Sequence, residues 1–146
     1  MSYTKLTYHI IFSTKGRRAF LNAQTLPRLV EYIGGIIRNL GGNSVEINGP
    51  EDHLHVVVGL SPTVCLSECV RDIKCNSSRW IHEAFPQASA FAWQDEYAAF
   101  SVSESALPKV IEYVRNQQEH HKRVSFGDEL AALLKRHGVK YDERYL

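Results

Sequence analysis

The chain has 146 residues, 44% hydrophobic and 23% charged, so its composition is that of an ordinary globular domain and excludes a disordered, collagen-like or disulfide-scaffold protein. Seventeen Lys and Arg against sixteen Asp and Glu give a formal net charge of +1, which neither requires nor excludes a nucleic-acid partner. Since the sequence holds no apolar stretch of roughly 18 residues and no secretory signal, we expect one cytoplasmic domain, residues 1–146.

The predicted elements combine strands with alternating apolar residues and helices with apolar residues at helical spacing. In chain order they are a strand at 6–13, a helix at 25–40, strands at 44–48 and 53–60, a helix at 66–85, a strand at 98–103, a helix from about 105 to 121 and a short helix at 128–137. This β-α-β-β-α-β order is typical of a ferredoxin-like fold, with two helices on one face of an antiparallel sheet and the other face open. We therefore predict an α+β protein, ferredoxin-like with additional C-terminal helices.

Two histidines share one face of the predicted strand 53–60. Side chains alternate along a strand, so His53 and His55 point to one side and the apolar residues between and after them to the other. The apolar side must pack on the helices, which leaves both imidazoles on the open face. Two neighbouring imidazoles can bind one divalent ion, although such a pair also occurs in purely structural roles.

The predicted helix 105–121 carries two polar residues one turn apart. At about 100° per residue, Tyr113 and Gln117 project from the same flank, at the border of the apolar stripe. From there both would reach a single ion or phosphate. The alternative is that they simply occupy the half-buried border of an amphipathic helix.

Together, His-x-His on a strand and Tyr-x-x-x-Gln on a following helix resemble the HUH single-tyrosine transposases, insertion-sequence enzymes of the IS200-like and REP-associated type that act on single-stranded DNA. The resemblance covers nearly the whole chain, and none of the three catalytic elements is missing. The segments that carry it are Phe12–Lys15, Asp52–His55, Ile73-Lys74, Ser77-Ser78, Trp80, Trp93-Gln94, Phe100–Ser103, Tyr113, Gln117–His121 and Ser125-Phe126.

The resemblance implies a DNA transposase that cleaves and rejoins single strands through a 5′-phosphotyrosine intermediate. Tyr113 would be the nucleophile, while His53, His55 and Gln117 would hold a divalent metal ion, Mg²⁺ or Mn²⁺. Phosphodiester transfer needs such a nucleophile and a cation that stabilises charge on the phosphoryl oxygens. Two further tyrosines lie in the C-terminal tail, without ligand residues at helical spacing, and are weaker candidates.

Further residues are expected around this site. Asp52, His9 and His120 are candidates to lie next to the ligands and the nucleophile.

The implied partner is single-stranded DNA with hairpin ends, and the implied assembly is a homodimer in which Tyr113 serves the histidines of its own chain or of its partner. Basic residues flanking the open face or its rim are expected to neutralise DNA phosphates; they are Lys15, Arg17, Arg18, Arg71, Lys74, Arg79, Lys122 and Arg123.

Two other classes of function stay open. One is a non-catalytic module that binds single-stranded nucleic acid on a ferredoxin-like sheet, which has no need for Tyr113 and Gln117 opposite the histidines. The other is a metallohydrolase whose ion activates water. It would need a carboxylate beside the histidines, and only Asp52 is near in the sequence. A covalent protein–DNA adduct separates the three classes, because only the transposase forms one.

Overall fold

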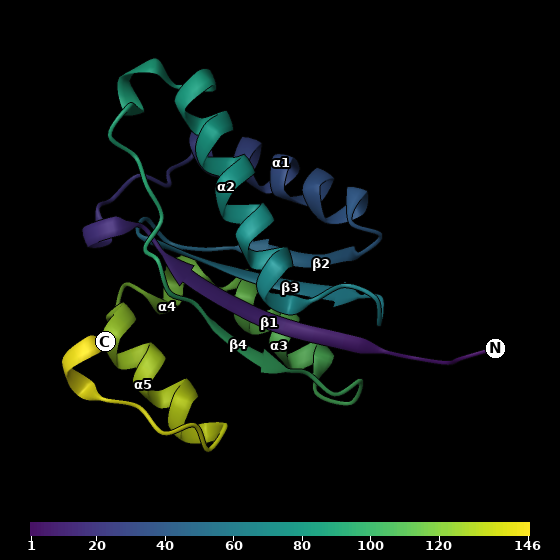
Figure 1. The fold of residues 1–146 in the computed structure, drawn as a ribbon. Coiled ribbons are helices and arrows are strands. Elements are labelled where there is room, and N and C mark those ends of the chain that lie inside the picture. The colour runs from purple at the N-terminus through teal and green to yellow at the C-terminus, as the bar shows by residue number, and fades with distance from the viewer.

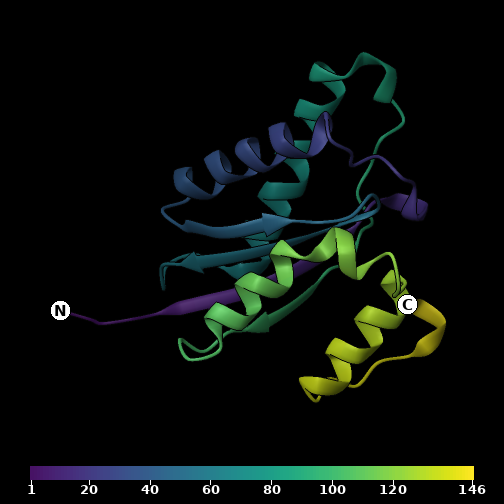
Figure 2. The ribbon, with the colours of Figure 1, turned by 180° about the vertical axis from the view of Figure 1, so that it is seen from behind.

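In the computed structural model, which describes all 146 residues, a four-stranded antiparallel sheet lies between two helical layers (Figures 1 and 2). The α+β, ferredoxin-like prediction is confirmed. No helix is long and apolar enough to cross a membrane. The sheet order is β2-β3-β1-β4, and the elements are β1 (Leu6–Ser13), α1 (Thr25–Asn39), β2 (Asn43–Asn48), β3 (His53–Leu60), α2 (Leu66–Ala84), β4 (Ala98–Ser101), α3 (Leu107–Arg115), α4 (Gln117–His120) and α5 (Phe126–Arg136).

The two central strands, β1 and β3, present different chemistry to the two layers. On one side their apolar residues, among them Phe12 and Leu54, pack with α1 and α2 in a core cluster of 16 buried residues. The other side carries the histidines together with apolar residues such as Ile11. There Ile11 lies opposite His55 and Ser13 opposite His53 in the antiparallel register. The alternation predicted for both strands is therefore what the structure has.

The histidine side of the sheet is covered, so the expectation of an open face was wrong. Helices α3, α4 and α5 lie over it (Figure 2), and His53 and His55 are fully buried. A second apolar cluster holds α5 in place: Phe126, Leu133 and Leu134 of the helix pack with Ile11 of β1 and Phe100 of β4. The apolar stripes of the C-terminal helices need a surface to cover, and this side of the sheet is the one left by α1 and α2.

The helix predicted from about 105 to 121 is interrupted. It ends as α3 at Arg115, and α4 starts after Asn116. Asn48 at the end of β2 accounts for the interruption. Its side-chain amide donates hydrogen bonds to the backbone carbonyls of Val114 at 3.0 Å and Arg115 at 3.1 Å. The amide also pairs with the side chain of Gln118 in both directions, so β2 fixes the point where the chain turns.

Replacing Asn48 with Ala is expected to lower the free energy of unfolding by about 1–2 kcal/mol, because it removes the donor for the carbonyls at the end of α3. Urea unfolding followed by circular dichroism measures the change. Asn43→Ala is the matched control, since Asn43 is an exposed residue at the start of the same strand. Equal losses in the two variants would contradict this role of Asn48.

Candidate active site

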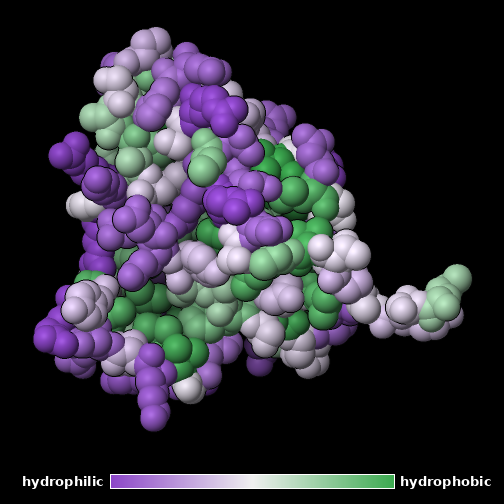
Figure 3. Space-filling view, viewed as in Figure 1, coloured by the Kyte–Doolittle hydropathy of each residue, from purple (hydrophilic) through white to green (hydrophobic).

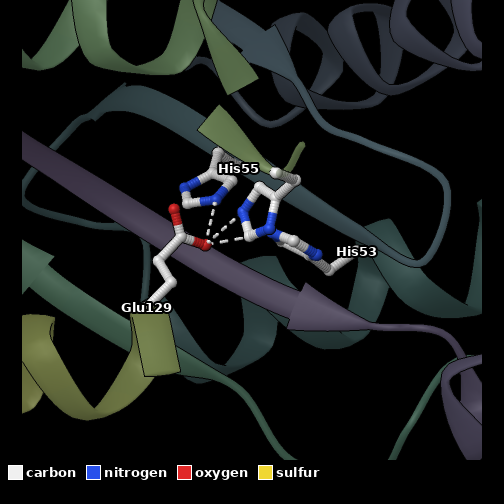
Figure 4. Close-up of side chains that lie close together, drawn as sticks. His53, His55 and Glu129 are labelled. Carbon is white, nitrogen blue, oxygen red and sulfur yellow. Dashed lines mark hydrogen bonds and ion pairs between the residues drawn. The ribbon is translucent and has the colours of Figure 1, made fainter. Parts of the chain in front are cut away.

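Glu129 of α5 lies at the centre of a buried cluster of polar side chains. Its Oε1 atom accepts hydrogen bonds from the Nε2 atoms of His53 and His55, each at 3.1 Å (Figure 4). A third imidazole, that of His121, donates to the same oxygen at 3.0 Å. The Glu129 side chain is only 2% exposed. The histidine pair therefore shares one buried carboxylate oxygen with a third histidine.

The other carboxylate oxygen of Glu129 contacts the nucleophile candidate. Both the Tyr113 hydroxyl and the Gln117 amide, the latter at 3.0 Å, donate hydrogen bonds to Oε2. Nε2 of His120 lies 3.4 Å from this oxygen. Burial, together with the hydrogen bond and charge of Glu129, raises the pKa of Tyr113 well above that of a free phenol. Tyr113 and Gln117 thus meet at one oxygen although the helix between them is interrupted.

Each histidine of the pair is held by a second neighbour. Nδ1 of His53 lies 2.8 Å from Asp52 Oδ1, and Nδ1 of His55 lies 2.7 Å from Nε2 of His9. These contacts turn the Nε2 atoms of both rings toward Glu129. A partner on the far ring nitrogen is how proteins orient a metal-binding histidine.

The pKa values of the two rings of the pair shift in opposite directions. Burial lowers the pKa of His55 to about 4 and that of His9 to about 3, so both are neutral at pH 7. Burial also opposes the charge of His53, but hydrogen bonds to Asp52 and Glu129 outweigh it and raise the pKa of that ring. A neutral imidazole offers a lone pair to a cation, whereas a protonated one must first lose its proton.

The predicted metal ligands fit a divalent ion. The Nε2 atoms of His53 and His55 face one point, and Gln117 is fully buried beside them. Gln117 Oε1, the atom with which an amide binds a metal, has no hydrogen-bond partner. An unpaired buried acceptor is costly, and a cation would satisfy it.

A groove of about 910 Å³ runs along the His53 side of this cluster. Asp52 and His121, which both contact the cluster, also line the groove, together with Arg17 and Lys122. The Arg17 guanidinium lies 5.0 Å above the ring of Phe126, at the start of α5. The groove therefore places the basic side chains of Arg17 and Lys122, together with the acidic side chains of Glu51 and Asp52, close to the buried histidines.

The basic residues predicted to contact DNA fall into two groups. Lys15, Arg17 and Arg18 follow β1, and Lys122 and Arg123 follow α4. All five are exposed, and Arg17 and Lys122 are the two that line the groove. Lys122 also pairs with Glu119 at 2.8 Å.

The other group, Arg71, Lys74 and Arg79, lies on α2, in the layer on the far side of the sheet (Figure 1). The expectation that these residues flank the histidine face was wrong, because the buried stripe of α2 packs on the opposite core. The Lys74 ammonium donates to the backbone carbonyls of residues 94–96 at 2.7–3.2 Å, so it holds the loop before β4. Its burial lowers the pKa of Lys74.

A second cleft, of about 790 Å³, separates α5 and the C-terminal tail from the ends of β1 and β4. Its wall includes Ile11, Leu130 and Leu134, and hydrophobic surface is visible in this region in Figure 3. The cleft does not include the histidine pair. Its wall is formed in part by the apolar cluster that joins α5 to β1 and β4.

Sequence reasoning missed Glu129 and the role of His121. A signal for Glu129 was present, because it lies between Phe126 and Leu133 on the apolar stripe of α5, where a charged residue needs a buried partner. His121 was part of a Gln-Glu-His-His run without an assigned role. Neither residue can be paired with the histidines of β3 by spacing, since Glu129 lies 74 residues after His55.

Comparisons with known proteins point to one family. The sequence matches the family "Transposase IS200 like" over residues 2–117. The ISDra2 transposase TnpA of Deinococcus radiodurans is 23% identical over 120 residues, which cover 79% of this chain and 86% of that protein. The family match, residues 2–117, includes Tyr113, Gln117 and both histidines of β3, but not His121 or Glu129.

Two solved structures have similar folds. A protein of Deinococcus radiodurans R1 assigned as a transposase is 26% identical, with a TM-score of 0.67 over 80% of this chain and 93% of that one. A REP-associated tyrosine transposase bound to a REP hairpin is 17% identical, with a TM-score of 0.63 over 85% of this chain and 73% of that one. The family match spans most of the length of this chain. The chain therefore belongs to the IS200-like transposase family, as its motifs predicted.

Proposed function

We propose that this transposase cleaves and rejoins single-stranded DNA through a covalent bond between Tyr113 and a 5′ phosphate. The observation that carries the proposal is the contact of the Tyr113 hydroxyl with the carboxylate that also binds His53 and His55. The proposed nucleophile and two of the predicted metal ligands thus contact the same carboxylate. The REP-associated relative is bound to a REP hairpin, which supports single strands with hairpin ends as the substrate.

The reaction exchanges one phosphodiester for another. The Tyr113 oxygen forms a bond to phosphorus, the bond from phosphorus to the 3′ oxygen breaks, and the phenol proton ends on that 3′ oxygen. His53, His55 and Gln117 would hold Mg²⁺ or Mn²⁺, which supplies positive charge for the phosphoryl oxygens. Asp52 and His9 orient the two imidazoles. Since the phosphotyrosine conserves the bond, rejoining needs no ATP.

The test is a search for the covalent intermediate. The purified protein is mixed with Mn²⁺ and single strands copied from the two flanks of its own gene, and the products are separated under denaturing conditions. We expect a protein–DNA band that survives denaturation, with the nucleotide on the peptide that contains Tyr113. Cleaved DNA without such a band would contradict the proposal.

Glu129 favours one second candidate, hydrolysis by a metal-activated water. That chemistry needs a carboxylate beside the histidines, and Glu129 is such a residue. A hydrolase leaves the protein unmodified and does not depend on the Tyr113 hydroxyl. The absence of an adduct combined with full cleavage by Tyr113→Phe would therefore favour this candidate.

We expect the DNA to follow the groove beside the cluster. Arg17→Ala and Lys122→Ala should each weaken binding and reduce the slope of log affinity against log salt by about 0.7 for a lost contact to single-stranded DNA. Fluorescence anisotropy at several salt concentrations measures the slope. Arg79→Ala is the control, because Arg79 lies on α2 in the far layer. Equal slopes in all three variants would exclude the groove as the path of the DNA.

We expect a homodimer in which each chain completes its own site, because Tyr113 and the histidines meet at Glu129 within one chain. A mixture of Tyr113→Phe and His53→Ala chains should then stay inactive in adduct formation. If each site instead took Tyr113 from the partner, one of the two sites in each mixed dimer would be active, which is about a quarter of all sites when equal amounts of the two chains assort at random. Light scattering at micromolar concentration tests the dimer itself, and a monomer there would contradict it.

A further inference from the structure

We propose that Glu129 and His121 are ligands of the divalent ion, so that α5 and the segment before it form part of the metal centre. The proposal rests on the metal-dependent function proposed above and adds two residues to it. Both lie beyond residue 117, where the match to the family ends. The family segment would then supply only part of the ligand set.

The distances between the donor atoms match those that an ion requires. One ligand atom from each of His53, His55, His121 and Glu129 lies within 4.8 Å of all the others. Glu129 Oε1 is 3.0–3.1 Å from the three Nε2 atoms. Neighbouring ligands on bonds of about 2.1 Å lie about 3.0 Å apart in octahedral and 3.4 Å apart in tetrahedral coordination. The distances from Glu129 Oε1 to the three imidazoles therefore already match those between neighbouring ligands of one ion.

The charges in the cluster favour the same conclusion. All ion pairs of Glu129 are with histidines, and no Lys or Arg lies within pairing distance of it. A buried carboxylate is costly without a full opposite charge, and a divalent ion between it and the imidazoles supplies one. Mixed imidazole and carboxylate ligands are a common donor set for divalent metals.

The packing of α5 holds the carboxylate in position. Phe126 and Leu133, on either side of Glu129 along the buried stripe, belong to the apolar cluster that joins α5 to β1 and β4. The helix N-terminus is capped by Ser125, whose Oγ accepts a hydrogen bond from the backbone N–H of Asp128. The helix therefore presents Glu129 to the histidines without any need for it to move, as a metal ligand requires.

Manganese binding tests the proposal without relying on activity. The affinity for Mn²⁺ is measured by titration, with free Mn²⁺ followed by electron paramagnetic resonance, for the wild type, Glu129→Gln, Glu129→Asp, His121→Ala and His53→Ala. Asp128→Asn is the matched control, since it removes the neighbouring, exposed carboxylate of the same helix. Circular dichroism melting shows that each variant is folded.

We expect Glu129→Gln and His121→Ala to bind Mn²⁺ at least 10-fold more weakly than the wild type, because even an outer-sphere partner typically contributes a factor of about 10–100. The Mn²⁺ affinity of Glu129→Asp should lie between those of the wild type and Glu129→Gln, since this variant keeps the charge on a shorter side chain. If Glu129→Gln does not fold, the affinity of Glu129→Asp tests the proposal. Asp128→Asn should bind like the wild type.

The proposal would be overturned if Glu129→Gln or Glu129→Asp bound Mn²⁺ at least as tightly as the wild type. The Glu129 carboxylate would then only occupy the place of the ion in the metal-free protein. If His53→Ala loses binding in the same series, the metal site proposed for the reaction stands. If the wild type binds no Mn²⁺, both the ligand proposal and the metal-dependent mechanism are wrong.

Discussion

Replacing Tyr113 with Phe is expected to abolish the covalent protein–DNA adduct, with a loss on the order of 10³-fold or more, because the substitution removes the attacking oxygen. The fold should persist. Glu129 keeps its hydrogen bonds to the Gln117 amide and to three imidazoles, so the free energy of unfolding should fall by only about 1–2 kcal/mol. Denaturing electrophoresis measures the adduct, and urea unfolding measures the stability.

Tyr145→Phe is the matched control for this experiment. Tyr145 is 75% exposed in the C-terminal tail, has the same phenol group and makes no contact with the histidines, so its replacement should leave adduct formation unchanged. DNA binding by Tyr113→Phe should stay within about twofold of the wild type, because the hydroxyl is not one of the basic groups that neutralise phosphates. An adduct formed by Tyr113→Phe at the wild-type level would exclude Tyr113 as the nucleophile.

His53→Ala and His55→Ala are each expected to lower adduct formation at least 100-fold, because each removes one of the imidazole ligands that hold the ion at the reacting phosphate. Wild-type protein treated with a chelator should show the same loss, and added Mn²⁺ should restore it. The variants should not recover with Mn²⁺ at the concentration that restores the wild type.

His82→Ala is the control for the histidine variants. His82 lies on α2, and its imidazole donates a hydrogen bond to the carbonyl oxygen of Phe91, far in the fold from β3. Its replacement should leave both metal binding and adduct formation unchanged. Full activity of the chelated wild type would show instead that the histidine cluster has a structural role, with Asp52 and His9 as its polar partners.

The sequence was informative wherever the periodicity of a single element decides the structure. Alternation along β3 placed His53 and His55 on one face, and one turn of helix placed Tyr113 beside Gln117. These relations depend only on backbone geometry. The prediction of the family rested on the same residues.

The remaining features depend on contacts between distant elements. The interruption after Arg115 is produced by Asn48, 67 residues earlier, and no local pattern contains that contact. The closure of the histidine face depends on how α5 packs on Ile11 and Phe100. Glu129 combines the two cases. Its place within an apolar stripe indicates a buried partner, but nothing in the spacing says which residue that partner is.

The distance between His55 and Glu129 along the chain also sets a delay during synthesis. The two residues are 74 positions apart, and at about 5–20 residues per second the ribosome needs roughly 4–15 s to make the segment between them. During that interval the strand with the histidines exists without the carboxylate, and the helix that covers the site has not been made. A nascent chain therefore holds an incomplete centre, and the complete cluster of histidines, tyrosine and carboxylate forms only after α5 has been synthesised.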